Sequence, residues 1–131
     1  MNFKELILKK EKLNKKELNE QLQWFSNSLG LSSLRDKSKS CFRIFIELLK
    51  TTKMQKPVSS DELAFKLHLT RGTVVHHLNK LMDSGLVVSQ KNKYLLRTTS
   101  LKKLTEELKK DTNEFFESIL PIAEEIDKSL N

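Results

Sequence analysis

Apolar side chains recur at intervals of three and four residues along most of the chain, and this pattern predicts amphipathic helices. The first expected helix covers residues 2–28, and Gly30 lies where a helix C-cap belongs. The second covers residues 34–52, and the last apolar stripe runs over residues 101–130. Pro121 lies inside that last stripe, so it should either kink the helix or begin a new one.

Between the second and the last helix, the pattern predicts two short helices and a hairpin. A capping box at Ser59 opens a helix over residues 60–67, and a tight turn leads into a helix over residues 71–84 that Thr70 can cap. The apolar period then changes. Residues 86–98 are typical of two short strands around a turn that contains Asn92, a residue that tolerates the left-handed conformation.

This order of elements predicts a winged helix–turn–helix domain, of the mainly α (α+β) class, in which a recognition helix enters the major groove of DNA and a hairpin, the wing, lies beside it. The length of 131 residues suits a single domain. We expect it to consist of an N-terminal helix in residues 1–30, a winged core in residues 34–100 and a C-terminal helix in residues 101–131.

The charge is concentrated in the middle of the chain. The whole sequence has 24 Lys and Arg against 17 Asp and Glu, a net charge of +7. Residues 31–100 hold thirteen basic and five acidic side chains, whereas residues 101–131 hold five basic and eight acidic ones. A basic middle segment favours a polyanionic partner such as double-stranded DNA, although lysines that merely solvate helix surfaces would give the same count.

The sequence TVVHHLNKL at residues 73–81, followed by SGLV at residues 84–87, resembles the recognition helix and the following strand of the ArsR-like winged-helix repressors. More broadly it resembles the MarR-type regulators, and the resemblance covers about residues 40–100. It implies a homodimeric, sequence-specific transcription regulator, with the first and last helices forming the dimer interface. We expect a repressor that acts on a pseudo-palindromic operator.

The helical phase separates the side chains that face the core from those that can face DNA. The predicted inward stripe consists of Val74, Leu78, Leu81 and Met82, so the opposite face is free for base edges and phosphates. Arg71 suits a phosphate or a guanine edge, and Asn79 suits adenine. For each candidate the alternative is a solvated polar side chain. The candidate DNA contacts of the helix and the wing are Arg71, Gly72, Thr73, Val75, His76, Asn79, Lys80, Gln90, Lys91, Asn92, Lys93 and Arg97.

The histidines and the cysteine do not suggest a metal site. Neighbouring His76 and His77 point about 100° apart on a helix, and His77 leans toward the core as a packed histidine. The metal sensors among the ArsR-like proteins would carry a cysteine pair near residues 62–66 and histidines on the last helix, and neither is present here. Cys41 lies among apolar residues and should be a small buried hydrophobe. We therefore expect no metal and no cofactor.

Other classes of protein are disfavoured. The chain has no glycine-rich phosphate loop and no HExxH motif, so we expect no enzyme. No apolar run approaches the roughly 20 residues of a membrane span, and the lone cysteine suits a reducing cytoplasm. Two alternatives remain open, a winged-helix module for protein–protein contact and a non-specific architectural DNA binder. Nothing in the residues identifies a small-molecule effector.

Overall fold

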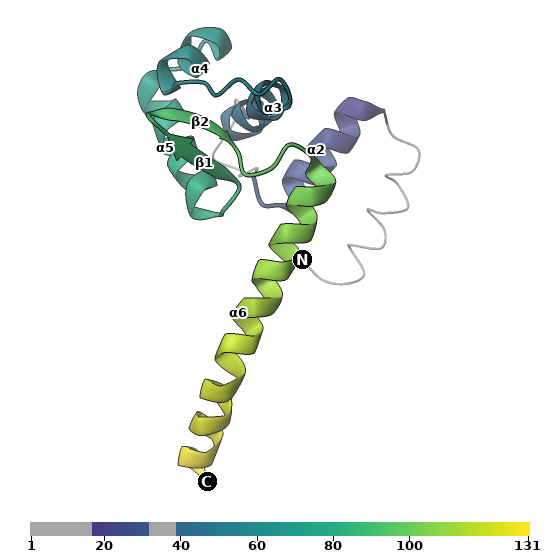
Figure 1. Ribbon diagram of the computed structural model, residues 1–131, viewed down its shortest axis with the longest axis vertical. Coiled ribbons are helices and arrows are strands. Elements are labelled where there is room, and N and C mark those ends of the chain that lie inside the picture. The colour runs from purple at the N-terminus through teal and green to yellow at the C-terminus, as the bar shows by residue number, and fades with distance from the viewer. Residues whose placement is uncertain (1–16, 32–38) are drawn as a thin grey trace. The chain divides into compact units, whose positions relative to one another are not determined.

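The computed structural model describes residues 17–31 and 39–131, which are mostly helical with one small sheet (Figure 1). The elements in chain order are α2 (Leu18–Ser28), α3 (Ser40–Lys53), α4 (Ser60–Leu67), α5 (Arg71–Asp83), β1 (Val87–Gln90), β2 (Lys93–Leu96) and α6 (Leu101–Leu130). This order confirms the predicted fold class, a winged helix–turn–helix with a long C-terminal helix.

The chain divides into two compact units, whose boundary crosses α3 and α5. Of the described residues, the first unit contains 17–31, 39–47 and 60–78, and the second contains 48–59 and 79–131. Each unit has buried apolar side chains of its own. Those of the first include Ile44, Phe45, Leu63, Val74 and Leu78, and those of the second include Leu48, Leu81, Leu86, Leu96 and Leu104.

The expected N-terminal helix differs from the structure. Glu17 has an extended backbone, with φ −72° and ψ 163°, and α2 begins only at the next residue. One continuous helix over residues 2–28 is therefore wrong at Glu17, and residues 2–16 of that prediction lie outside the described residues. The end of α2 is as predicted. Gly30 has φ +76°, and its amide and that of Leu31 bond back to the last turn of the helix.

The helix α3 also begins later than predicted. Lys39 has φ +55°, a left-handed conformation that cannot continue an α-helix, so α3 starts at Ser40. Residues 34–38 of the predicted helix lie outside the described residues. Cys41 is buried, as expected of a small apolar side chain.

In the first unit, two polar contacts tie α4 to α3. The guanidinium of Arg43 donates to the carbonyl of Leu67, the last residue of α4. The ammonium of Lys66 lies 2.5 Å from the carboxylate of Glu47, whose side chain is only 7% exposed. These contacts satisfy an end of α4 and a buried charge, so they fix the helix that precedes the recognition helix.

In the second unit, β1 and β2 form an antiparallel hairpin whose register runs from Val87 opposite Leu96 to Gln90 opposite Lys93. The two turn residues, Lys91 and Asn92, have φ +51° and +64°. Left-handed conformations at both central residues are the requirement of a type I′ turn, which suits the twist of a two-residue hairpin. The prediction gave this conformation to Asn92, and the structure gives it to Lys91 as well.

The hairpin is anchored from outside its own strands. Val58 and Tyr94 exchange two backbone hydrogen bonds of 3.1 and 2.7 Å, so one residue of the preceding connector extends the sheet. The strand ends nearest the hairpin base, Val87 and Leu96, are buried, whereas the residues next to the turn are exposed.

Helix α6 is continuous through Pro121, so no new helix begins there (Figure 1). Its N-cap is Ser100, whose hydroxyl accepts a 3.0 Å hydrogen bond from the amide of Lys103. Leu104 is fully buried, but every residue after Leu108 is exposed. Within the described part of the chain, no helix is both long enough and apolar enough to cross a membrane.

Candidate nucleic-acid interface

The recognition helix α5 has one buried face. Val74, Leu78 and Leu81 are at most 1% exposed, in agreement with the predicted stripe. His77 is 8% exposed, so it is the packed histidine that its helical phase predicts. Met82, the fourth predicted member, is half-buried. The buried face fixes the rotation of α5, and this rotation decides which side chains reach solvent.

The opposite face of α5 is exposed and polar. Its exposed residues are Arg71, Gly72, His76, Asn79 and Lys80, while Thr73 and Val75 are half-buried at its edge. All seven predicted contacts of this helix thus lie outside the buried stripe. Their side chains offer positive charge, hydrogen-bond donors and acceptors, and a methyl-bearing edge, which are the groups that read DNA.

The first turn of α5 is held by a threonine pair. The hydroxyl of Thr70 accepts a 3.2 Å hydrogen bond from the amide of Thr73 and donates a 2.8 Å bond to the hydroxyl of Thr73. This is the N-cap that the sequence predicts at Thr70. The hydroxyl of Thr73 accepts in this pair, so its own proton remains available to donate.

Two neighbouring residues at this end of the helix are accessible. A Cβ added to Gly72 would meet no atom within 4 Å, so the backbone here faces open space. The Arg71 guanidinium lies 3.4 Å from the Asp61 carboxylate, and both side chains are about three-quarters exposed. An exposed pair of this kind is weak, so Arg71 can exchange the carboxylate for a phosphate or a base.

Farther along α5, the ring of His76 meets that of His77 edge to face, with 5.3 Å between the ring centres. This contact orients an exposed imidazole against a buried one. Among the described residues, no group of three or more His, Cys, Asp or Glu gathers in a way that could hold a metal ion.

The tip of the wing is a second exposed, basic surface. Gln90, Lys91, Asn92 and Lys93 form the turn and its two flanking residues, and all four are exposed. Because both turn residues are left-handed, the chain reverses within two residues. Lys91 and Lys93 therefore both lie at this end of the hairpin. The wing therefore offers a compact cationic end.

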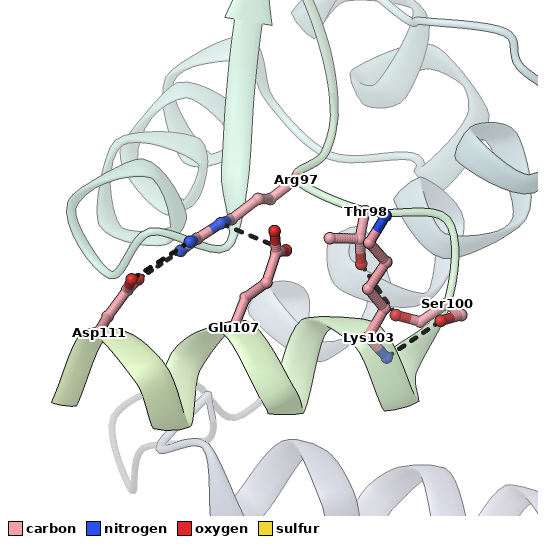
Figure 2. Close-up of polar contacts among 6 residues, drawn as sticks. All are labelled: Arg97, Thr98, Ser100, Lys103, Glu107 and Asp111. Atoms are coloured by element: carbon pink, nitrogen blue, oxygen red, sulfur yellow. Dashed lines mark hydrogen bonds and ion pairs between the residues drawn. The ribbon is translucent and has the colours of Figure 1, made fainter. Parts of the chain in front are cut away.

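Arg97 differs from the other candidates. Its side chain is 28% exposed, and its guanidinium is engaged by two carboxylates of α6 (Figure 2). Two nitrogens donate to Asp111 over 2.6 and 3.3 Å, and Nε lies 3.5 Å from Glu107. The hydrogen bond from Arg97 holds the pKa of the Asp111 carboxyl below its ordinary value, and the same bond raises the pKa of Arg97. The pair is therefore fully charged near neutral pH.

Several residues that hold these surfaces were missed by the sequence reasoning. Arg43, Glu47 and Lys66 fix α4, and Thr52 accepts a hydrogen bond from the amide of Leu96. One signal was available. Glu47 lies within the apolar stripe of its helix, between Ile44 and Leu48, and a carboxylate in such a place needs a cationic partner. The choice of Lys66 has no signature in the sequence.

Part of the chain matches the model of a known family. Residues 47–89 match the family model of bacterial regulatory proteins of the arsR family. The match runs from the middle of α3 through α4 and α5 into β1, so it covers the helix–turn–helix and the start of the wing. A search among curated proteins gives no significant match. The fold, the exposed face of α5 and this match together support a DNA-binding transcription regulator whose residues 47–89 are similar to the helix–turn–helix of the arsR family.

Proposed function

We propose that this protein is a repressor that binds as a homodimer to a pseudo-palindromic operator. Helix α5 enters the major groove, and the wing tip contacts the flanking backbone or the minor groove. The observation that carries the proposal is the exposed polar face of α5 within the segment that matches the arsR family. A helix with one buried face and one exposed basic face is the element that major-groove readers use.

The side chains of α5 suit separate tasks. Arg71 and Lys80 supply positive charge at the two ends of the exposed face, for phosphates or for a guanine edge. Asn79 matches the donor and acceptor of adenine, and His76 adds another hydrogen-bonding group. Val75, half-buried, suits the methyl group of thymine. Thr73 lies in the first turn of α5 and can donate its hydroxyl proton to DNA.

The wing suits a backbone contact. Lys91 and Lys93 carry flexible point charges, which attract phosphates without reading sequence. Gln90 and Asn92 add hydrogen-bond donors at the same exposed tip. We assign most of the sequence preference to α5. The wing is expected to contribute mainly to the overall affinity for DNA.

The exposed half of α6 supports the homodimer. Its apolar stripe continues the one that starts at buried Leu104, but past Leu108 no residue that the structure describes buries it. The large exposed apolar side chains are Phe115, Phe116, Ile119, Leu120, Ile122, Ile126 and Leu130. An apolar surface of this extent is unusual on a monomer, and a second copy supplies a matching stripe. Leu18, 71% exposed on α2, extends the proposal to the N-terminal helix.

Repression follows from the simplest use of such a dimer. A protein bound across a promoter blocks polymerase by occupying the DNA and needs no further surface. In a twofold dimer, the two recognition helices lie about 34–36 Å apart and read half-sites one helical turn apart.

A fluorescence-anisotropy titration tests the proposal. The full chain is titrated into a DNA fragment from upstream of its own gene and into a shuffled fragment, each at two salt concentrations. We expect the native fragment to bind roughly a thousandfold more tightly at physiological salt, as sequence-specific regulators do. Equal affinities that fall together with salt would indicate an architectural binder, and no binding to either fragment would indicate a protein-docking module. Footprinting that gives two related half-sites supports the dimer, and a single unrepeated half-site contradicts it.

A further inference from the structure

The base of the wing and helix α6 meet at one guanidinium. Glu107 and Asp111 lie one helical turn apart, on the same face of α6, and both face Arg97 (Figure 2). Two parallel N–H···O contacts to Asp111 form a forked geometry, which fixes direction as well as distance. Arg97 is thus held more firmly than an ordinary surface arginine.

The same residue also touches the end of the recognition helix. The Arg97 amide donates a 2.9 Å hydrogen bond to the carbonyl of Leu86, the residue just before β1. A Cβ added to Gly85 would lie 3.6 Å from an Arg97 guanidinium nitrogen. Gly85 is the left-handed residue that ends α5. Arg97 therefore lies beside three elements, which are the end of α5, the base of the wing and α6.

These contacts argue against a direct role in binding phosphate. The guanidinium faces two carboxylates, so this cluster carries more negative than positive charge. If Arg97 turned to DNA, it would leave Glu107 and Asp111 without their cationic partner beside a polyanion. Lys91 and Lys93, by contrast, are exposed at the wing tip, and the described residues include no carboxylate paired with either.

We propose that Arg97 is a positioning residue, whose contacts with Glu107 and Asp111 fix the wing base and the end of α5 to α6, so that a displacement of α6 changes DNA binding. This proposal rests on the proposed function, because it concerns how DNA binding by the protein is controlled. Any ligand or partner that shifts the first turns of α6 would act through this contact.

The decisive variant is Asp111→Asn, because the two explanations predict opposite signs. If Arg97 were a phosphate contact, removing Asp111 would free it and would tighten binding to every DNA. If Arg97 positions the wing, Asp111→Asn weakens binding to the operator by roughly threefold or more, the range expected for one surface ion pair, and does not weaken binding to shuffled DNA. The matched control is Glu124→Gln, which removes the same charge from an exposed site of α6 that has no ion pair among the described residues.

A second measurement does not need DNA. Amide hydrogen exchange at Arg97 and along β1 and β2 reports local opening of the wing base. We expect exchange to be roughly threefold faster in Asp111→Asn than in Glu124→Gln, and to return toward the wild-type rate in the charge-swapped variant that combines Arg97→Asp with Asp111→Arg. Rescue by the swap distinguishes a specific pair from a general effect of either substitution.

The two proposals fail in different ways. A wild-type protein that does not distinguish the operator from shuffled DNA overturns the proposed function, and the exchange experiment still tests the link. Equal exchange in Asp111→Asn and Glu124→Gln overturns the positioning role of Arg97, as does operator binding that becomes tighter in Asp111→Asn.

Discussion

The side-chain oxygen of Thr52, near the end of α3, accepts a 2.9 Å hydrogen bond from the backbone amide of Leu96, the last residue of β2. Both residues are at most 3% exposed. The wing therefore donates a hydrogen bond to a helix residue 44 positions earlier in the chain. A buried amide without a partner is costly, so this threonine supports the wing although it lies outside the candidate DNA contacts.

Replacement of Thr52 by valine keeps the shape of the side chain and leaves the Leu96 amide unpaired. We expect the free energy of unfolding to fall by about 1–3 kcal/mol, measured by urea denaturation. The control is Thr105→Val, which removes an exposed hydroxyl that bonds only within α6 and should change stability by less than about 0.5 kcal/mol. Equal losses in the two variants would contradict the importance of the Thr52 bond.

Gly72→Ala should separate folding from DNA binding. The new methyl group meets no atom within 4 Å, and alanine is the better helix former, so we expect a gain in stability of up to about 1 kcal/mol. Operator affinity should nevertheless fall, because the methyl group enters the space through which DNA approaches the backbone. Thermal unfolding and anisotropy on the same preparation check both signs. Unchanged operator affinity would remove Gly72 from the interface.

Arg71→Ala and Lys91→Ala should weaken DNA binding in different ways. If Arg71 reads a base, its loss weakens binding to the operator more than to shuffled DNA, by about 1–3 kcal/mol. Loss of Lys91 should weaken both and reduce the slope of log affinity against log salt by about one unit. Titrations at several salt concentrations give both quantities. An equal loss on all sequences from Arg71→Ala would make Arg71 a phosphate contact.

Ile122→Glu should separate the two copies of the proposed dimer. This isoleucine is 56% exposed, so the charge costs little in a monomer but would be buried in an interface. We expect the dissociation constant of the dimer to rise at least about tenfold, measured by sedimentation equilibrium. Glu117→Gln, outside the apolar stripe of α6, is the control. Identical sedimentation of Ile122→Glu and wild type would locate the interface elsewhere.

The contribution of Asp111 to stability should be independent of pH down to about pH 5 and disappear in acid. Its pKa in the folded protein lies below the ordinary value of 3.8, chiefly because Arg97 donates hydrogen bonds to it. A carboxyl with a depressed pKa stabilises the fold above its unfolded pKa, and this stabilisation is lost as the pH falls through the folded pKa. The difference in urea midpoint between wild type and Asp111→Asn should therefore be constant from pH 7 to about pH 5 and shrink as the pH falls below 3.8 through the lower pKa of the folded protein. A difference that grows in acid would contradict this assignment.

Apolar periodicity, together with capping and turn residues, was sufficient to predict the central elements. The prediction of 60–67 for α4 agrees with the structure, α5 ends one residue before the prediction, and the hairpin lies within its predicted range. The burial of His77 also followed from helical phase. Apolar spacing is a local property, and these elements are set by local patterns.

The errors have a different origin. At Lys39 the backbone is left-handed, a conformation that a lysine in the sequence does not predict. The predicted helix follows the apolar spacing and therefore begins before α3 does, which starts at Ser40. Arg97 stays a predicted DNA contact, and what the sequence does not show is its ion pair. Its partner Asp111 is fourteen residues away, and only the tertiary arrangement brings the two together.

The left-handed backbone of Lys91 places two demands on one position. A side chain with a Cβ is strained at φ +51°, whereas glycine would adopt this conformation without penalty. Glycine would also remove a positive charge from the tip of the wing, which we propose binds DNA. Selection for a sturdier hairpin and selection for tighter binding therefore favour different residues at position 91. Lysine at this position keeps the charge of the proposed DNA contact at a cost in backbone strain within the turn.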